Sequence, residues 1–518
     1  MTIDQLPPLL VAVPLTGAAV MVLLRGQIRI QRAVSVLVSI SLVVMSAMLL
    51  LEVHDGGVVL SRLGGWPKGL GIPLVADPLA AVMTVIASGT LLIVLLFGIG
   101  QFDDDQEIRL HPLYQVLAAG LLMVFLTGDL FNLFVAFEIT LAASYVLLLL
   151  ASGRDTIRPL ITYVVINLVG STLLLITIAF IYGATGTLDF NLLTTRLADL
   201  PDTVNTALRI LLLVVFGIKA AIFPVFNAVP DSYPTAPTAI TAVFAGLLTK
   251  MGVYAMIRTQ AQVFGRAETG PDQLILILAA LTMIVGVLGA LAQDDIKRIL
   301  SFHTISQVGF MVMGLGLFSV AGLAGAVVYI IHYIPTKVAL FLVSGLVTKR
   351  TGGTSLARTH GLIGTAPVVA GLFAVFALGL SGIPPSSGFV AKLSLVQAGL
   401  DAGQGWVVAA SLVASLLTMV SMTKVWSGSF LGEPTPPPGP APSMVGYPLM
   451  TAVTFGVLGV TIAIAVAAGP VTRVSLVAAE HLLVPTGELL TDEMVVDDVP
   501  AADMLAEDEP TPEEGVQQ

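Results

Sequence analysis

Five ionisable side chains lie inside or at the edge of long apolar segments, and the chemistry that such groups can perform there is proton exchange. Glu138 is near the middle of one such segment, and Lys219, Lys250, Lys337 and Lys392 lie in four others. A charge at bilayer depth is costly and usually functional. Burial favours the neutral form of each group, whereas a nearby opposite charge favours the charged form. We therefore interpret the set as a proton path; the alternative is a static structural ion pair.

Two histidines extend this set. His303 begins a polar stretch inside an apolar helix, and His332 lies five residues before Lys337. A histidine ring titrates between about pH 5 and 8 and can accept at one nitrogen while it donates from the other. This property suits a proton relay, although an isolated membrane histidine is often only a hydrogen-bonded structural residue.

The amino-acid composition indicates the class of protein to which these groups belong. The chain has 518 residues, of which 56% are hydrophobic and 11% charged, with a mean hydropathy of +0.96. Soluble proteins carry about 25% charged residues. The absence of cysteine excludes thiol chemistry and cysteine-ligated clusters. The sequence contains no nucleotide-binding loop and no metal-ligand spacing, so we expect no cofactor, no metal and no enzyme, and energy from an ion gradient or partner subunits.

The apolar segments predict an all-α polytopic membrane protein. A transmembrane helix needs roughly 20 apolar residues, which gives about fourteen spans. The expected spans are 5–24, 31–52, 77–100, 112–128, 130–151, 158–183, 206–229, 236–257, 273–292, 299–317, 320–347, 366–399, 405–428 and 446–468. The loops on one side hold more Lys and Arg, which predicts that both the N-terminus and the C-terminal tail lie outside.

Two of these segments are interrupted in similar ways. Pro224 follows Lys219 in the seventh, and Pro384 and Pro385 precede Lys392 in the twelfth. Proline interrupts a helix at membrane depth only where protein or water satisfies the freed groups. Broken helices in both halves are typical of internally repeated transporters. We therefore expect two inverted five-helix repeats.

The chain divides accordingly into five regions. They are a three-helix region at 1–109, repeats at 110–260 and 272–430, a final helix at 446–468 and an acidic tail at 474–518. The tail has no Lys or Arg and many acids, which predicts disorder.

Four segments resemble a known family. They are FNLFVAFEITLAASYVLL around Glu138, PTAPTAITAVFAGLLTKMGVYAMIR around Lys250, DDIKRILSFHTISQVGFMVMG around His303 and GIPPSSGFVAKL around Lys392. The chain is similar, over about residues 110–432, to the antiporter-like subunits shared by Mrp-type multisubunit sodium/proton antiporters and respiratory complex I, and most of all to the D-type subunits of the Mrp antiporters.

The resemblance implies a role for each position. Glu138 and Lys219 would form a coupling pair, and Lys250 would pass the proton to the second half. His303, His332 and Lys337 would continue a central hydrophilic axis, and Lys392 would connect it to an exit. Tyr333 departs from the pattern, because many relatives carry a second histidine beside the one that corresponds to His332.

The implied function is proton movement within a bacterial cell-membrane antiporter that exchanges a monovalent cation such as Na⁺ for protons. Its partners would be the other subunits of that complex and membrane lipids. Two alternatives stay open: a proton-pumping subunit of a redox-driven, complex I-like NADH:quinone oxidoreductase, which would use the same residues, and a structural membrane subunit with static ion pairs.

Overall fold

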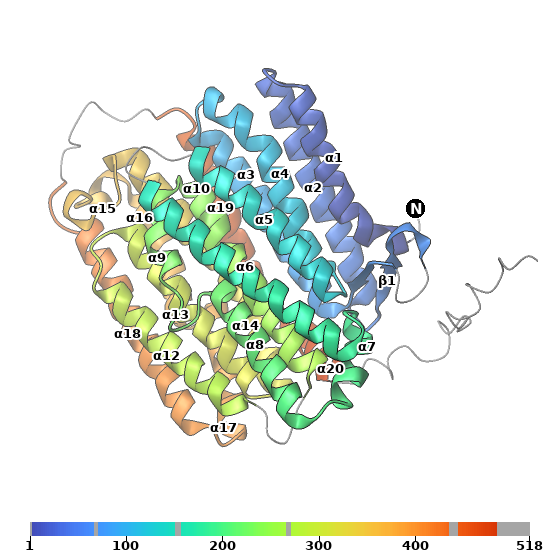
Figure 1. Ribbon diagram of the computed structural model, residues 1–518. Coiled ribbons are helices and arrows are strands. Elements are labelled where there is room, and N and C mark those ends of the chain that lie inside the picture. The colour runs from blue at the N-terminus through green and yellow to red at the C-terminus, as the bar shows by residue number, and fades with distance from the viewer. Residues whose placement is uncertain (1–2, 67–70, 151–156, 266–270, 435–443, 484–518) are drawn as a thin grey trace, which may run out of the picture.

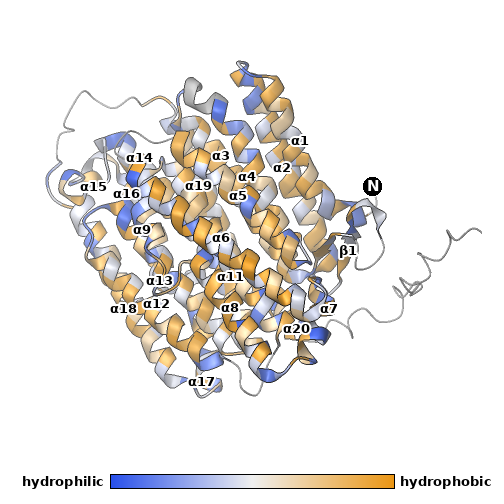
Figure 2. Ribbon diagram, in the orientation of Figure 1, coloured by the Kyte–Doolittle hydropathy of each residue, from blue (hydrophilic) through white to orange (hydrophobic). Residues whose placement is uncertain are grey.

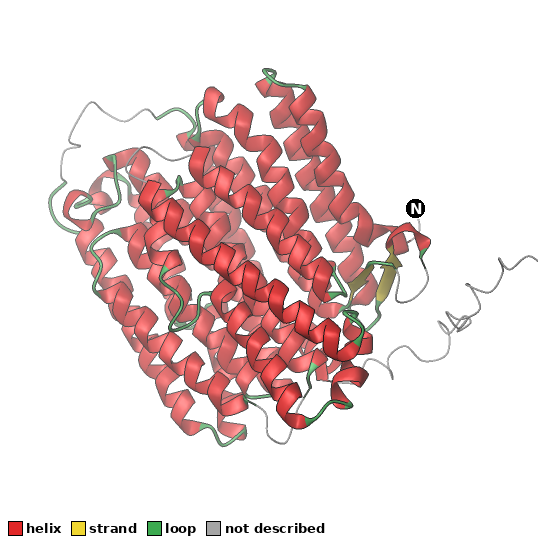
Figure 3. Cartoon of the chain, viewed as in Figure 1, coloured by secondary structure: helices red, strands yellow, loops and turns green. Residues whose placement is uncertain are grey.

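The computed structural model describes residues 3–66, 71–150, 157–265, 271–434 and 444–483. Within these ranges helices joined by loops make up the chain, together with one hairpin of two strands, β1 (Val59–Arg62) and β2 (Pro73–Ala76), paired antiparallel with Val59 opposite Ala76 (Figure 3). The helices of the first half are α1 (Leu6–Leu23), α2 (Ile28–Val53), α3 (Pro78–Gln101), α4 (Asp104–Leu126), α5 (Leu130–Leu150), α6 (Ile157–Thr185), α7 (Phe190–Ala198), α8 (Asp202–Ala220), α9 (Ala228–Ser232), α10 (Thr238–Val243) and α11 (Thr249–Ile257). Those of the second half are α12 (Asp272–Leu291), α13 (Ile296–Gly316), α14 (Val320–Thr351), α15 (Leu362–Thr365), α16 (Pro367–Ser381), α17 (Ser387–Asp401), α18 (Gly405–Ser429), α19 (Tyr447–Val466) and α20 (Ala468–Leu483).

The predicted fold class is confirmed. In the described part of the chain, 13 helical segments are long and apolar enough to cross a membrane, and hydrophobic residues dominate their ribbons (Figure 2). The remaining predicted span is the broken twelfth, which is divided between the shorter helices α16 and α17. Both halves therefore contain a broken helix, while the proposed repeat boundaries stay a prediction.

Of the helices that carry the predicted proton path (Figure 1), those with Lys250, His303 and Lys337 are the most deeply buried. In the most apolar 18-residue stretch of the segment 238–263 and of α14, all residues are buried, and in that of α13 94% of the residues are buried. In the corresponding stretches of α2 and α19, only 33% and 22% of the residues are buried, so much of their apolar surface lies on the outside of the bundle. Lys250, Lys337 and His303 therefore lie on helices shielded by other helices.

The two predicted breaks have the same local order. Helix α8 ends at Ala221, whose φ of 59° is left-handed, and a cis bond between Phe223 and Pro224 follows. Helix α16 ends at Gly382, with φ 81°, and a cis bond between Pro384 and Pro385 follows. A left-handed residue ends a helix because its backbone can no longer continue the hydrogen-bond ladder.

The span that carries Lys250 is longer than predicted and contains two π-helical turns. One turn covers Phe244–Leu248, just before α11, and the other, Arg258–Val263, extends the helix beyond the predicted end at residue 257. Arg258, just beyond the predicted span 236–257, is therefore a buried helical residue and not part of the following loop.

The structure also differs from the predicted disordered tail over residues 474–483. These residues belong to α20, whose Ser475, Ala478, Ala479 and Leu482 are buried. The prediction averaged the composition of the whole tail, whose acids begin only at Glu480, whereas the small residues before it allow close helix packing. His481 of α20 lies beside Gly56, in the loop before β1, so α20 ends on the same side of the bundle as the N-terminal hairpin. The rest of the predicted tail, 484–518, lies outside the described residues.

Candidate functional site

Glu138 and Lys219 are joined through a third side chain. The Ser171 hydroxyl, on α6, donates a hydrogen bond to Glu138 Oε1 on α5. The same hydroxyl oxygen accepts a hydrogen bond of 2.6 Å from Lys219 Nζ on α8. The predicted pair therefore exists as a hydrogen-bonded bridge rather than a direct ion pair. Ser171 has no charge and belongs to no motif, so the sequence alone does not reveal it.

The Lys219 side chain lies at the last turn of α8, just before the break. Its ammonium also donates to the Asn167 carbonyl at 3.2 Å and lies 5.7 Å from the centre of the Phe137 ring. A cavity of about 30 Å³ adjoins it, lined among others by Asn167, Tyr233 and Thr249. Most of its lining is apolar, but Asn167, Lys219, Tyr233 and Thr249 supply polar groups, so a cavity of this size can hold about one hydrogen-bonded water molecule. The neighbour of Lys250, Thr249, therefore shares a small hydratable space with Lys219.

Lys250 is fully buried at the centre of the bundle. Its ammonium donates to the Ala245 carbonyl at 2.9 Å and to Thr249 Oγ1 at 3.0 Å. Ala245 belongs to the π-helical turn, and π turns inside helices are frequent at functional sites. The ammonium also lies 4.0 Å from the centre of the Tyr333 ring on α14.

Lys337 also lies near that ring, one helical turn from Tyr333 along α14. Its ammonium donates to the Leu300 carbonyl of α13 and lies 6.0 Å from the centre of the Tyr333 ring. The Phe341 ring is 5.5 Å away. The described structure thus gives both buried lysines neutral hydrogen-bond acceptors and aromatic faces.

The remaining predicted residues continue along the second half. His303 Nε2 lies 2.9 Å from Ser421 Oγ of α18, and His332 Nδ1 lies 2.8 Å from Ser387 Oγ, at the start of α17. Lys392 donates from Nζ to the Ser381 carbonyl at 3.0 Å and to the Leu380 carbonyl at 3.1 Å. These two carbonyls end α16, where a helix carries partial negative charge that favours an ammonium.

The structure thus brings two pairs of the seven predicted residues together indirectly: Ser171 bridges Glu138 and Lys219, and Lys250 and Lys337 both lie near the Tyr333 ring. The order of the whole axis from Glu138 to Lys392 stays a prediction. Across the ranges that the structure describes, no group of three or more His, Cys, Asp or Glu is placed to hold a metal ion. Lys424, on α18, pairs with Asp294 at 2.8 Å and is not one of the seven predicted residues.

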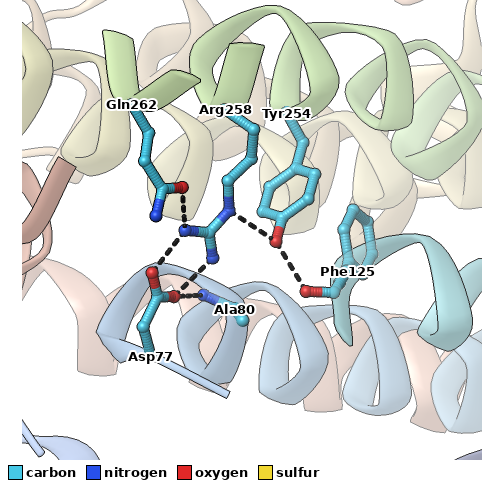
Figure 4. Close-up of polar contacts among 6 residues, drawn as sticks. All are labelled: Asp77, Ala80, Phe125, Tyr254, Arg258 and Gln262. Atoms are coloured by element: carbon cyan, nitrogen blue, oxygen red, sulfur yellow. Dashed lines mark hydrogen bonds and ion pairs between the residues drawn. The ribbon is translucent and has the colours of Figure 1, made fainter. Parts of the chain in front are cut away.

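A second polar cluster, which no sequence pattern indicated, lies near the C-terminal end of the helical segment 238–263 that carries Lys250 (Figure 4). The Arg258 guanidinium makes two contacts with the Asp77 carboxylate, which begins α3. Tyr254 accepts from Arg258 Nε at 2.9 Å and donates to the Phe125 carbonyl at 2.6 Å. Burial alone raises the pKa of Asp77, but the Arg258 charge and the Ala80 N–H outweigh it and hold that pKa below its usual value.

Comparison with known proteins identifies the family of the chain. Residues 127–418 match the family model described as "NADH:quinone oxidoreductase/Mrp antiporter, TM". The D-type Na(+)/H(+) antiporter subunit of Alkalihalophilus pseudofirmus is 40% identical over 92% of this chain and 97% of its own length. A chain of the Mrp complex from Dietzia sp. DQ12-45-1b superposes with a TM-score of 0.88 at 33% identity, covering 94% of this chain and 99% of that one.

A chain of respiratory complex I from Thermus thermophilus shares the fold, with a TM-score of 0.77 at 23% identity over 93% of this chain and 100% of that one. The family match covers more than half of the sequence and includes every residue of the predicted axis. The chain is thus a multi-pass membrane protein that belongs to the NADH:quinone oxidoreductase/Mrp antiporter transmembrane family.

Proposed function

We propose that this protein is the proton-translocating subunit of a multisubunit Na⁺/H⁺ antiporter in a bacterial plasma membrane. The observation that carries the proposal is the bridge from Glu138 through Ser171 to Lys219. This bridge joins an acid to a base across three helices in the membrane interior.

The bridge gives a proton a route without a large movement of heavy atoms. Lys219 can pass a proton to the Ser171 oxygen while Ser171 passes its own hydroxyl proton to Glu138. The charged pair then becomes a neutral pair, and both end states are accessible because burial disfavours isolated charges. Rotation of the Ser171 hydroxyl away from Glu138 would break the connection.

The proton would continue from Lys219 to Lys250 through water in the adjoining cavity. Thr249 lines that cavity and accepts a hydrogen bond from Lys250, which makes its hydroxyl a suitable intermediate. From Lys250 the axis leads past Tyr333 to Lys337, His303 and His332, and then to Lys392 at the second break. The cation exchanged for protons would be Na⁺, and the other subunits of the complex would be its partners.

The comparisons favour an antiporter over a redox-driven pump. The antiporter relative from Alkalihalophilus pseudofirmus is 40% identical over nearly its whole length, whereas the complex I chain shares the fold at 23% identity. We therefore assign this chain to a gradient-driven transporter rather than to a redox enzyme.

The test uses the complete antiporter complex in everted membrane vesicles from an antiporter-deficient strain. Addition of Na⁺ should dissipate a preformed pH gradient, and Glu138→Gln should abolish that response while the complex still assembles. Glu52→Gln, an exposed acid on α2, is the matched control and should exchange normally. Normal exchange by an assembled Glu138→Gln complex would overturn the proposal.

A further inference from the structure

Two buried ammonium groups from different helices lie near the Tyr333 ring. Lys250 Nζ is 4.0 Å from the ring centre, and Lys337 Nζ is 6.0 Å from it. Tyr333 and Lys337 are one turn apart on α14, whereas Lys250 reaches the ring from α11. All three residues have no exposed surface. The ring therefore lies near one ammonium group from each predicted half of the axis.

Neither ammonium has a carboxylate partner among the described residues. Lys250 contacts the Ala245 carbonyl and Thr249, and Lys337 contacts the Leu300 carbonyl. The other titratable groups nearby are His303 on α13, Tyr329 on α14 and Tyr233 just after α9, and none of them is an acid with an ordinary negative charge. Two positive charges in this dry region would repel each other strongly.

The face of an aromatic ring carries partial negative charge and attracts an ammonium within about 6 Å of its centre. A separation of 4.0 Å is well inside this range, and 6.0 Å is at its limit. A small motion of either lysine would therefore change which ammonium the ring stabilises.

We propose that the face of Tyr333 holds the transferred positive charge at the junction of the two halves, on Lys250 or on Lys337 but not on both. Tyr333 is a positioning residue, because its ring stabilises an ammonium and its own hydroxyl exchanges no proton in this step. The inference rests on the proposed proton relay. It assigns the step between Lys250 and Lys337 to a residue that does not itself gain or lose a proton.

The ring, not the hydroxyl, carries this role. Tyr333→Phe keeps the aromatic face, whereas Tyr333→Leu removes it with a comparable loss of packing. A ring that only fills space would make the two variants differ in assembly or rate, but not in the pH at which exchange is half-maximal.

The test measures Na⁺-dependent exchange by the full complex in everted vesicles between pH 6 and 10. Tyr333→Phe should keep the wild-type midpoint. Tyr333→Leu should move the midpoint to lower pH by about one unit, since an ammonium without the ring face binds its proton less tightly; one unit corresponds to about 1.4 kcal/mol. Phe373→Leu truncates a buried ring on α16 that stacks on Trp426, and it should leave the midpoint unchanged.

If Tyr333→Leu fails to assemble, 3,4,5-trifluorophenylalanine at position 333 replaces it, because fluorination weakens the ring face and nearly preserves its shape. This residue should shift the midpoint downward relative to phenylalanine. An unchanged midpoint in an assembled Tyr333→Leu or fluorinated complex would overturn the inference, even where Lys250→Ala abolishes exchange. Normal exchange by Lys250→Ala would instead overturn the proton relay itself.

Discussion

Arg258 and Asp77, 181 positions apart in the chain, form a buried ion pair with two contacts. The pair fastens the far end of the Lys250 helix to the start of α3 (Figure 4). Tyr254, one turn before Arg258, extends this attachment to the end of α4. The cluster therefore fixes the rotation and height of a helix whose centre holds Lys250, although it lies outside the proposed proton path.

Removing one partner of this pair should destabilise the protein strongly. Asp77→Asn leaves the Arg258 charge buried without compensation, and such losses cost about 3–5 kcal/mol. Thermal unfolding of the purified complex should show the effect. Asp231→Asn is the control, because its pair with Arg298 is half exposed and pairs of this kind contribute about 1 kcal/mol or less. Equal melting temperatures for the two variants would contradict the prediction.

The contribution of Asp77 should also depend on pH in one direction. Its pKa in the folded protein is lowered, so its contribution to stability is fully present above the unfolded value of about 3.9 and is lost as pH falls through the folded value. The difference in melting temperature between the wild type and Asp77→Asn should be constant from pH 5 to 8 and narrow below about pH 4. A difference that grows on acidification would be inconsistent with a lowered pKa.

Ser171→Ala should slow Na⁺/H⁺ exchange by at least about tenfold, because it removes the hydroxyl that connects Glu138 to Lys219. Ser171→Thr keeps a hydroxyl and should retain most of the activity. Vesicles with equal amounts of assembled complex give the comparison. Full activity of Ser171→Ala would mean that water or direct contact replaces the hydroxyl.

Gly252→Ala should disturb the position of Lys219. An added Cβ would lie against the Ala220 nitrogen and 2.6 Å from the Lys219 carbonyl carbon, and backbone cannot move aside as a flexible side chain can. Overpacking of this kind costs about 1–3 kcal/mol. Gly89→Ala on α3, where a Cβ meets nothing within 4 Å, is the control. The melting temperature and the exchange rate should fall for Gly252→Ala alone.

The sequence predicted the spans and their breaks because both depend on local signals. Long apolar runs define spans, and Pro224, Pro384 and Pro385 mark the breaks within them. Glu138 and the four lysines were equally visible, because a charge inside an apolar run contrasts with its neighbours. These signals need no knowledge of which helices lie side by side.

The connections between these residues depend on packing and were not visible. Ser171 resembles any other serine in an apolar helix until α6 is placed across α5 and α8. Arg258 looked like a loop residue, because a charge near the end of an apolar run usually marks the water boundary, and its partner Asp77 is on a distant segment. Residues 474–483 of α20 were predicted to belong to the tail because the many acids from Glu480 onward dominate the composition of 474–518.

The length of α6 has a geometric consequence. Its 29 residues extend for about 44 Å at 1.5 Å per residue, whereas the hydrocarbon layer is about 30 Å thick. A helix of this length leans or extends beyond that layer, and Figure 1 shows α6 crossing the front of the bundle obliquely. Ser171 is the middle residue of α6, so a rocking motion of this strut about its midpoint would leave the hydroxyl nearly stationary while both ends sweep through several ångströms. The Glu138–Ser171–Lys219 connection would then tolerate changes in membrane thickness that displace the surrounding loops.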